Sequence, residues 1–147
     1  MVLLQNKKAT HEYKIEKTYT AGVVLSGPEV KSLRNKSGSL TGSFIKNVGA
    51  ELFLINAQIS PYKFADNIEY DPKRTRKLLL RKKEINTLVT ALEQKGRALV
   101  PLSFQLVANR VKLQFGLGVG LKLYDKRAKM KERTIQRDIA RQIKQVY

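Results

Sequence analysis

The chain has 147 residues, a length that fits one compact domain with a single core. Its 29 Lys and Arg residues outnumber 12 Asp and Glu, and the formal net charge of +17 favours a polyanionic partner, with nucleic acid first. The absence of Cys excludes disulfides and thiolate metal sites. At the start of the chain, MVLLQNKKATHE has too short an apolar run for a signal peptide, and no later run reaches the length of a membrane span. We therefore expect a cytoplasmic protein without a membrane partner.

Short runs rich in β-branched and aromatic residues, separated by turn signals, predict antiparallel strands from Tyr13 to about Leu117. The first run is YKIEKTYTAGVVL. In the second, GSFIKNVGAELFLINAQI, residues 47–50 fit a hairpin turn. In the third, GRALVPLSFQLVANRVKLQFGLG, Ala108 and Asn109 fit a turn between residues 103–107 and 110–115. Apolar residues alternate with polar ones from Val111 to Phe115, which predicts one buried face.

Two stretches predict helices instead. Residues 28–35 begin with a proline at a first-turn position. In residues 83–95, four apolar side chains follow the i, i+3, i+4, i+7 spacing of a helix face, and Gly96 stands where a C-terminal glycine belongs. About six strands with one or two small helices close most economically into a barrel. The expected fold class is therefore mainly β with small helices, as an OB-like antiparallel barrel.

A different region begins near Gly116. The alternate glycines of GLGVGLKLYDKR predict a flexible hinge, and we expect an RNA-binding barrel over residues 1–118, followed by a hinge and basic tail over residues 119–147. On a helix, the Ile and Val side chains from Ile135 to Val146 would form a thin stripe opposite one of Arg and Lys. Such a segment is expected to be disordered alone and to fold on RNA. A helix packed on the barrel, and a membrane-surface or protein-docking helix, are the alternatives.

Two further basic clusters point to phosphate contacts. DPKRTRKLLLRKKE holds seven Lys or Arg between positions 73 and 83, which favours a surface that binds RNA backbone, with an ordinary solvated loop as the alternative. NKKATHEYK adds lysines around His11 and Tyr13. With one His and no paired acids, no catalytic constellation is present. We expect neither an enzyme nor a metal or other cofactor.

Several of these segments also carry a family resemblance. NKKATHEYKIEKTYTAGVVLSGPEVKSLR, NAQISPY, DPKRTRKLLLRKKEI, ALVPLSF, RVKLQFGLG and YDKRAKMKERTIQRD stand in the order and spacing of the bacterial tmRNA-binding protein family, also called the SsrA-binding or small protein B family. The match runs from Asn6 into the tail. The resemblance implies an RNA-binding adaptor of trans-translation, the rescue of stalled ribosomes. Its OB-like barrel would bind the tRNA-like domain of tmRNA. Its tail would enter the decoding centre and the empty mRNA channel of the small subunit, along ribosomal RNA, and become helical there.

The resemblance and the basic clusters together give a set of expected site residues. Those that would face tmRNA are Asn6, Lys7, Lys8, His11, Tyr13, Glu29, Lys31, Arg34, Lys73, Arg74, Arg76 and Lys77. Those that would face the ribosome are Lys122, Tyr124, Asp125, Lys126 and Arg127 at the decoding centre, then Lys129, Lys131, Arg133, Ile135, Arg137, Ile139 and Arg141 in the channel.

Glu29 and the hinge need separate comment. As a carboxylate, Glu29 could accept hydrogen bonds from a base edge, or it could stabilise a helix N-terminus beside Pro28, and both roles are compatible. At the hinge, VGLKLYDKR departs from the family's K-G-K-K-x-H-D-K-R, which weakens its electrostatic anchoring. A general OB protein for structured RNA, or another ribosome-associated factor, is the alternative function. The high charge favours a monomer.

Overall fold

The computed structural model describes residues 1–120, and this part of the chain is mainly β. The structure confirms the expected fold class. In chain order the elements are β1 (Val2–Gln5), α1 (Ala9–Glu12), β2 (Tyr13–Val23), α2 (Gly27–Arg34), β3 (Gly38–Ser39), β4 (Phe44–Val48), β5 (Glu51–Ile55), β6 (Gln58–Ile59), β7 (Arg76–Leu79), α3 (Lys82–Leu92), β8 (Arg97–Val107) and β9 (Arg110–Gly120). Sequence patterns missed β1 and α1 because each is only four residues long.

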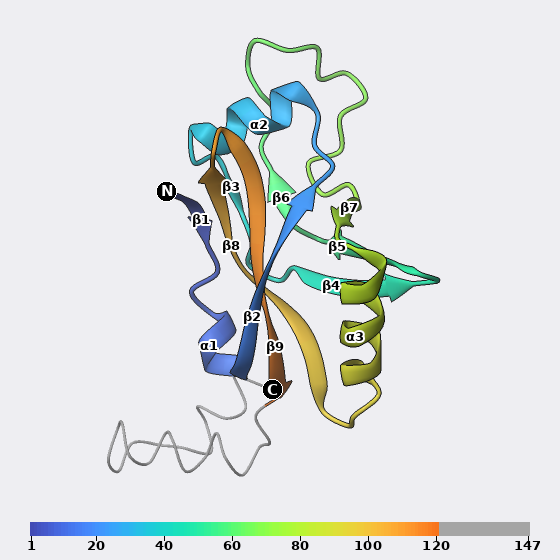
Figure 1. Cartoon of the computed structure of the whole chain (residues 1–147). Helices are drawn as coiled ribbons and strands as arrows, with labels where there is room; N and C mark the ends of the chain where they lie inside the picture. Colours follow the sequence, from blue (N-terminus) through green and yellow to red (C-terminus); the bar gives the residue numbers. More distant parts are fainter. Residues whose placement is uncertain (121–147) are drawn as a thin grey trace, which may run out of the picture.

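Seven of the strands form one antiparallel sheet in the order β1-β8-β9-β2-β7-β5-β4, and β3 pairs with β6 beside it. The long strands β2, β8 and β9 lie side by side, and the β4–β5 hairpin projects to one side of them (Figure 1). The sheet curls so strongly that its edge strand β4 packs against β8, near the opposite edge. This curl closes the sheet into an OB-like barrel, with α2 and α3 on its outside.

Local turn chemistry places both predicted hairpins correctly. Strands β4 and β5 pair from Phe44 with Ile55 to Val48 with Glu51, and Gly49 takes the positive φ of 61° that the turn requires. Strands β8 and β9 meet at Val107 and Arg110. Between them, Ala108 and Asn109 both have positive φ, at 50° and 63°, as in a type I′ turn.

Both predicted helices are present. Helix α2 matches the expected range closely, but α3 ends at Leu92, three residues before the predicted Lys95. The chain then turns, with the Arg97 N–H donating to the Gln94 carbonyl, and Gly96 takes a φ of 82° inside that turn. The glycine therefore marks the turn that leads into β8, and the helix ends before it.

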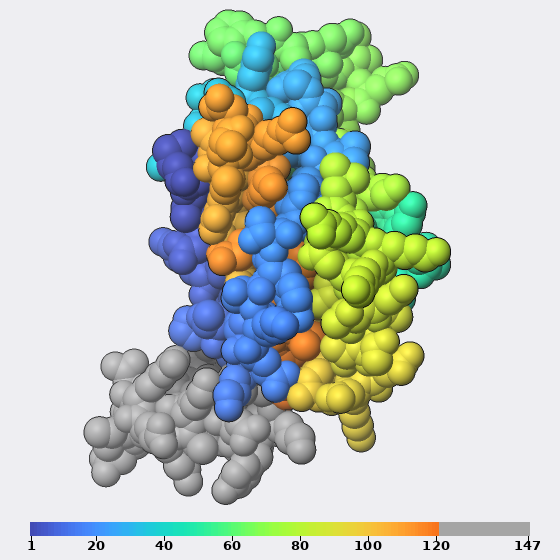
Figure 2. Space-filling view, viewed as in Figure 1, coloured from blue at the N-terminus to red at the C-terminus, as the bar shows by residue number. Residues whose placement is uncertain are grey.

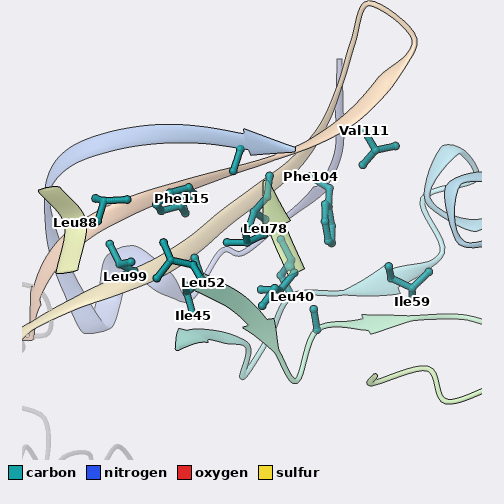
Figure 3. Close-up of a cluster of buried hydrophobic side chains, with 14 of the residues drawn as sticks. Leu40, Ile45, Leu52, Ile59, Leu78, Leu88, Leu99, Phe104, Val111 and Phe115 are labelled. Carbon is teal, nitrogen blue, oxygen red and sulfur yellow. The ribbon is translucent and has the colours of Figure 1, made fainter. Parts of the chain in front are cut away.

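The core fills the inside of the curled sheet and reaches from Leu88 of α3 on one side to Ile59 of β6 on the other (Figure 3). Leu113 and Phe115 of β9 point inward, as their alternation predicts, and meet Leu52 of β5 and Leu88 of α3 in one buried cluster. Leu78 of β7 is also buried, whereas the adjacent Leu79 is half exposed. Successive side chains of a strand face opposite sides, so the leucine run enters the core only at alternate positions.

The predicted hinge is wrong at its start, because β9 continues as a paired strand to Gly120. Its glycines serve close packing. A Cβ at Gly116 would lie 2.6 Å from Cγ2 of Ile15, and one at Gly118 would lie 3.0 Å from Cβ of Tyr13. Glycine therefore leaves room for the side chains of β2. The predicted boundary after residue 118 falls inside this strand, and the basic tail lies outside the described residues.

Across residues 1–120, no helix has both the length and the apolar character needed to cross a bilayer.

Candidate nucleic-acid interface

The N-terminus of α2 is built around a sequence signature for a capping box, Ser26-Gly-Pro-Glu29. The Ser26 N–H donates to Oε1 of Glu29 at 3.0 Å, and the Glu29 N–H donates to the Ser26 hydroxyl at 3.4 Å. Pro28 lies in the first turn, where its missing N–H costs nothing. The cap confirms the expected helix-terminus role of Glu29 and points its carboxylate away from solvent, toward the segment that precedes β7.

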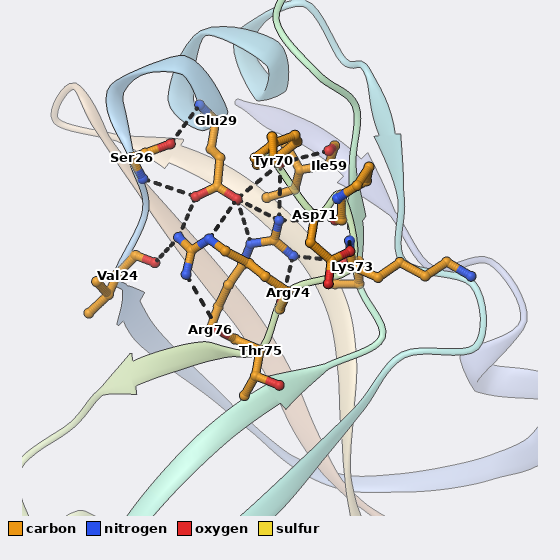
Figure 4. A network of polar contacts seen from close by, with 12 residues as sticks. Val24, Ser26, Glu29, Ile59, Tyr70, Asp71, Lys73, Arg74, Thr75 and Arg76 are labelled. Carbon is orange, nitrogen blue, oxygen red and sulfur yellow. Dashed lines mark hydrogen bonds and ion pairs between the residues drawn. The ribbon is translucent and has the colours of Figure 1, made fainter. Parts of the chain in front are cut away.

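That segment supplies two arginines to the same carboxylate (Figure 4). Arg76, whose side chain is fully buried, donates from Nε to Oε2 of Glu29 at 2.9 Å. Arg74 donates from Nε to the same oxygen at 3.2 Å, and its Nη2 makes a second contact with Oε1. The Tyr70 hydroxyl lies 3.1 Å from Oε2. We call Glu29, Tyr70, Arg74 and Arg76 the Glu29 network.

The buried arginine is also tied to the backbone. Arg76 Nη1 donates to the carbonyl of Ala57 at 2.8 Å and to that of Arg74 at 3.0 Å, and Nη2 donates to the carbonyl of Pro72 at 3.0 Å. A planar guanidinium has the several fixed donors that this arrangement needs. The Glu29 network therefore fixes α2, the short segment between β5 and β6 and the loop before β7 relative to one another.

The network shifts two pKa values. Burial by itself would raise the pKa of Glu29, but hydrogen bonds from Arg74, the Ser26 backbone and Arg76 outweigh it and lower the pKa from 4.5 to about 2. Burial, together with the negative charge of Glu29, raises the pKa of Tyr70 from 10.0 to about 12. Glu29 is therefore ionised and Tyr70 is neutral at physiological pH.

Glu29 and Arg76 were expected to contact RNA directly, whereas the structure buries both side chains. Both side chains are 0% exposed, and each is hydrogen-bonded to the other and to the surrounding protein. The side chain of Arg74 is 34% exposed, and most of its N–H groups donate to Glu29 and to the Val24 carbonyl. Glu29 and Arg76 are therefore internal supports, whereas part of the Arg74 side chain remains at the surface. A base could reach Glu29 only by displacing the two arginines.

The exposed expected residues at this end of the molecule surround the Glu29 network. Lys31 and Arg34 project from α2, and Lys73 projects from the loop before β7. Lys77, on β7, is partly neutralised by an ion pair of 2.9 Å with Glu51. The network ties α2, which carries Lys31 and Arg34, to the loop that carries Lys73. We call these three exposed residues the α2 face.

The other expected residues gather around α1. Asn6 is bound to β8, since its backbone N–H donates to the Leu102 carbonyl at 2.7 Å and its Nδ2 donates to the Pro101 carbonyl at 2.9 Å. Lys7, Lys8 and His11 are exposed beside it. Tyr13 is half-buried at the start of β2, opposite Gly120. We call the surface of Asn6, Lys7, Lys8, His11 and Tyr13 the α1 face.

A hollow of about 590 Å³ opens on the α1 face. Its lining includes Asn6, Lys8, Glu12 and Tyr13, together with Phe44 and the turn over residues 41–43. Phe44 is 46% exposed at its rim. The hollow combines an aromatic wall with a lysine, a combination that suits a nucleotide.

The structure thus divides the expected tmRNA-facing residues between two ends of the barrel. The α1 face and the α2 face lie at opposite ends of the long strands (Figure 1). The last described residue, Gly120 of β9, lies at the α1 face opposite Tyr13. The expected ribosome-facing positions, from Lys122 to Arg141, lie outside the described residues.

Sequence reasoning missed two parts of the site. The capping-box pattern was a signal for Ser26, but Tyr70 carried none, because its contact with Glu29 spans 41 residues. No group of His, Asp or Glu side chains within residues 1–120 has the arrangement of a metal site.

The chain is similar to known proteins in both sequence and structure. The family model described as SmpB protein matches residues 3–145. The SsrA-binding protein of Geobacillus kaustophilus is 48% identical over 140 residues, covering 95% of this chain and 90% of its own. That of Bacillus subtilis is 47% identical with the same coverage. A chain solved in a structure of tmRNA-SmpB and the bacterial ribosome is similar with a TM-score of 0.70 and 41% identity, covering 95% of this chain and 98% of its own.

Proposed function

Because this chain belongs to the SmpB protein family, we infer that it is the tmRNA-binding adaptor of trans-translation. It binds the tRNA-like domain of tmRNA and brings it to stalled ribosomes. The observation that carries this function is the family match over residues 3–145, together with a structural relative solved with tmRNA. The family acts by binding RNA, and we propose that this chain catalyses no step of its own. We propose that it acts in the cytoplasm, where ribosomes are found.

The two exposed basic surfaces support this function physically. The net charge of +17 attracts RNA over a distance, and lysines on the α1 and α2 faces can neutralise phosphates at contact. We propose that tmRNA is held through Asn6, Lys7, Lys8, His11 and Tyr13 at one end. Lys31, Arg34, Lys73, Arg74 and Lys77 would contribute at the other. Glu29 and Arg76 would act indirectly, by holding the α2 face in shape.

The division of labour between barrel and tail stays a prediction. We propose that the barrel binds tmRNA, while the tail, with its positions from Lys122 to Arg141, binds small-subunit ribosomal RNA at the decoding centre and in the empty mRNA channel. The tail would become helical there. Val119 and Leu121 stand where the family pattern has lysines, and Tyr124 stands where it has histidine. The two lost lysines reduce the positive charge around the end of β9, so the later Lys and Arg residues would carry more of the tail's attraction to RNA.

A competition experiment tests the proposed partner. Binding of the full-length protein to labelled tmRNA is measured by filter retention, with total transfer RNA as competitor, at two salt concentrations. We expect tmRNA to be retained when transfer RNA is in large excess. Equal affinity for both RNAs would instead indicate a general OB protein for structured RNA. Size-exclusion chromatography of the same sample tests the expected monomer.

Truncation after Gly120 tests the division of labour. This cut removes the tail and keeps β9 complete. We expect tmRNA affinity to remain within about threefold of the full chain, because both described faces are intact, whereas peptide tagging on stalled ribosomes is lost. Tagging by the truncated protein at the full-length rate would show that the tail is dispensable.

A further inference from the structure

The loop between β6 and β7 carries two large apolar side chains that the barrel does not use. Phe64 is 75% exposed and Ile68 is 89% exposed. The loop stands beside α2 at the end of the molecule and forms a prominent projection there (Figure 2). Exposed apolar side chains on a projecting loop are typical of a contact surface.

Hydrogen bonds give this loop a defined shape. Asn67 donates from Nδ2 to the carbonyls of Tyr62, at 2.8 Å, and Ala65, at 3.0 Å. The carboxylate of Asp66 accepts from the Ile68 N–H at 3.1 Å, so this acid shapes the turn. At the end of the loop, the Tyr70 hydroxyl contacts Glu29 and the Ile59 carbonyl. The loop therefore holds Phe64 and Ile68 outward on a fixed base, which lowers the entropy lost when a partner binds.

The aromatic rings of this loop are bordered by cations. The rings of Tyr62 and Phe64 meet edge to face, with centroids 5.5 Å apart. Lys63 Nζ lies 4.8 Å from the centroid of Phe64, and Lys31 Nζ of α2 lies 5.6 Å from that of Tyr62. Lys31 belongs to the α2 face, so the rings continue that basic surface. Aromatic faces flanked by lysines are the usual means of holding an unpaired base and its phosphates.

We propose that the tip of this loop, with Phe64 at its centre, is a stacking platform for an unpaired nucleobase of the bound RNA. Phe64 offers the ring surface, Ile68 extends the apolar contact, and Lys31 and Lys63 neutralise the neighbouring phosphates. The inference rests on the proposed function and adds a contact to it. An RNA occupant is favoured over an apolar protein surface because two lysine ammonium groups would have to be desolvated against such a surface.

The chain contains no Trp, which allows a direct optical test. In the full-length Phe64→Trp variant, the single indole reports its own environment. We expect tmRNA to quench its fluorescence, as a stacked base does, and a blunt-ended RNA duplex to leave it largely unquenched. The matched control is Val48→Trp, which places an indole at a position 53% exposed on the β4–β5 hairpin and outside both basic faces. Its fluorescence should not respond to either RNA.

Affinity gives a second readout. The Phe64→Ala variant should bind tmRNA about five- to 100-fold more weakly, the usual cost of losing one stacked base, while Val48→Ala binds as the wild type does. Unchanged tmRNA affinity of Phe64→Ala, or equal quenching of the Phe64→Trp variant by duplex and tmRNA, would overturn the platform. So would a defect of Phe64→Ala that appears only with ribosomes. Failure of the wild type to prefer tmRNA over transfer RNA would instead contradict the proposed function, so the two failures are distinguishable.

Discussion

Replacement of Glu29 by Ala is expected to destabilise the fold by about 3–5 kcal/mol, the usual cost of removing one partner of a buried ion pair. Arg76 is fully buried, and Glu29 is its counter-ion. Without the carboxylate, Arg76 keeps its hydrogen bonds to backbone carbonyls but retains an uncompensated charge in the interior. The capping box of α2 is lost in the same variant, which adds to the cost.

Urea unfolding followed by far-UV circular dichroism measures this change. The matched control is Glu51→Ala, because Glu51 also pairs with a cation, Lys77, but on the surface, where the two side chains are 47% and 44% exposed. Exposed pairs contribute little, so the control should lose under about 1 kcal/mol. Glu29→Gln keeps the side-chain shape and removes the charge. It should also lose more stability than the control, because its amide nitrogen would face N–H donors.

Measuring RNA binding by the same variants tests whether Glu29 supports the RNA-binding surface from inside the protein. If Glu29 holds the α2 face in shape, tmRNA affinity should fall in Glu29→Ala. When Phe64→Trp is combined with Glu29→Ala, the fluorescence response to tmRNA should change as well, since Tyr70 anchors that loop to Glu29. If Glu29→Ala lost no more stability than Glu51→Ala, the reasoning would be refuted, because the burial of Arg76 would then not depend on the Glu29 carboxylate.

Two other predictions concern acid stability and the β9 glycines. The pKa of Glu29 is about 2 in the folded protein and 4.5 as the reference value, so the unfolded chain takes up the proton first as the pH falls. The free energy of unfolding should therefore fall by about 3 kcal/mol between about pH 5 and pH 2, and by clearly less in Glu29→Gln. Urea unfolding at each pH measures this. Gly116→Ala should cost about 1–3 kcal/mol in the same assay, because the new methyl group would lie 2.6 Å from the branched side chain of Ile15. Gly27→Ala is its control, since a Cβ there has no neighbour within 4 Å, and a comparable loss in both variants would contradict the packing argument.

Much of the fold was predictable because its signals are local. Short stretches of sequence determine the turns at Gly49 and at Ala108-Asn109. The alternation of apolar and polar residues from Val111 to Phe115 identifies the inward face of β9. The class, a mainly β barrel with small helices, follows from such signals together with the need to cover strand edges.

The errors come from contacts between distant parts of the chain. Alternate glycines indicate flexibility when they are read alone, but Gly116 and Gly118 are required by Ile15 and Tyr13, about 100 positions earlier in the chain. Likewise, Arg76 belongs to a basic run that favours an RNA surface, whereas it is buried against Glu29, 47 residues away. A single sequence without pairing information cannot separate a buried arginine from its exposed neighbours Lys73 and Lys77 on these grounds.

The pairing of β9 on both of its edges also has a mechanical consequence. At its last residues this strand is bonded to β8, where Arg97 faces Val119, and to β2, where Tyr13 faces Gly120. A pull on the chain beyond Gly120 along the strand axis therefore loads two ladders in shear, whose hydrogen bonds lie across the direction of force and resist together. The barrel can bear tension from the segment that follows it without being unzipped from that end.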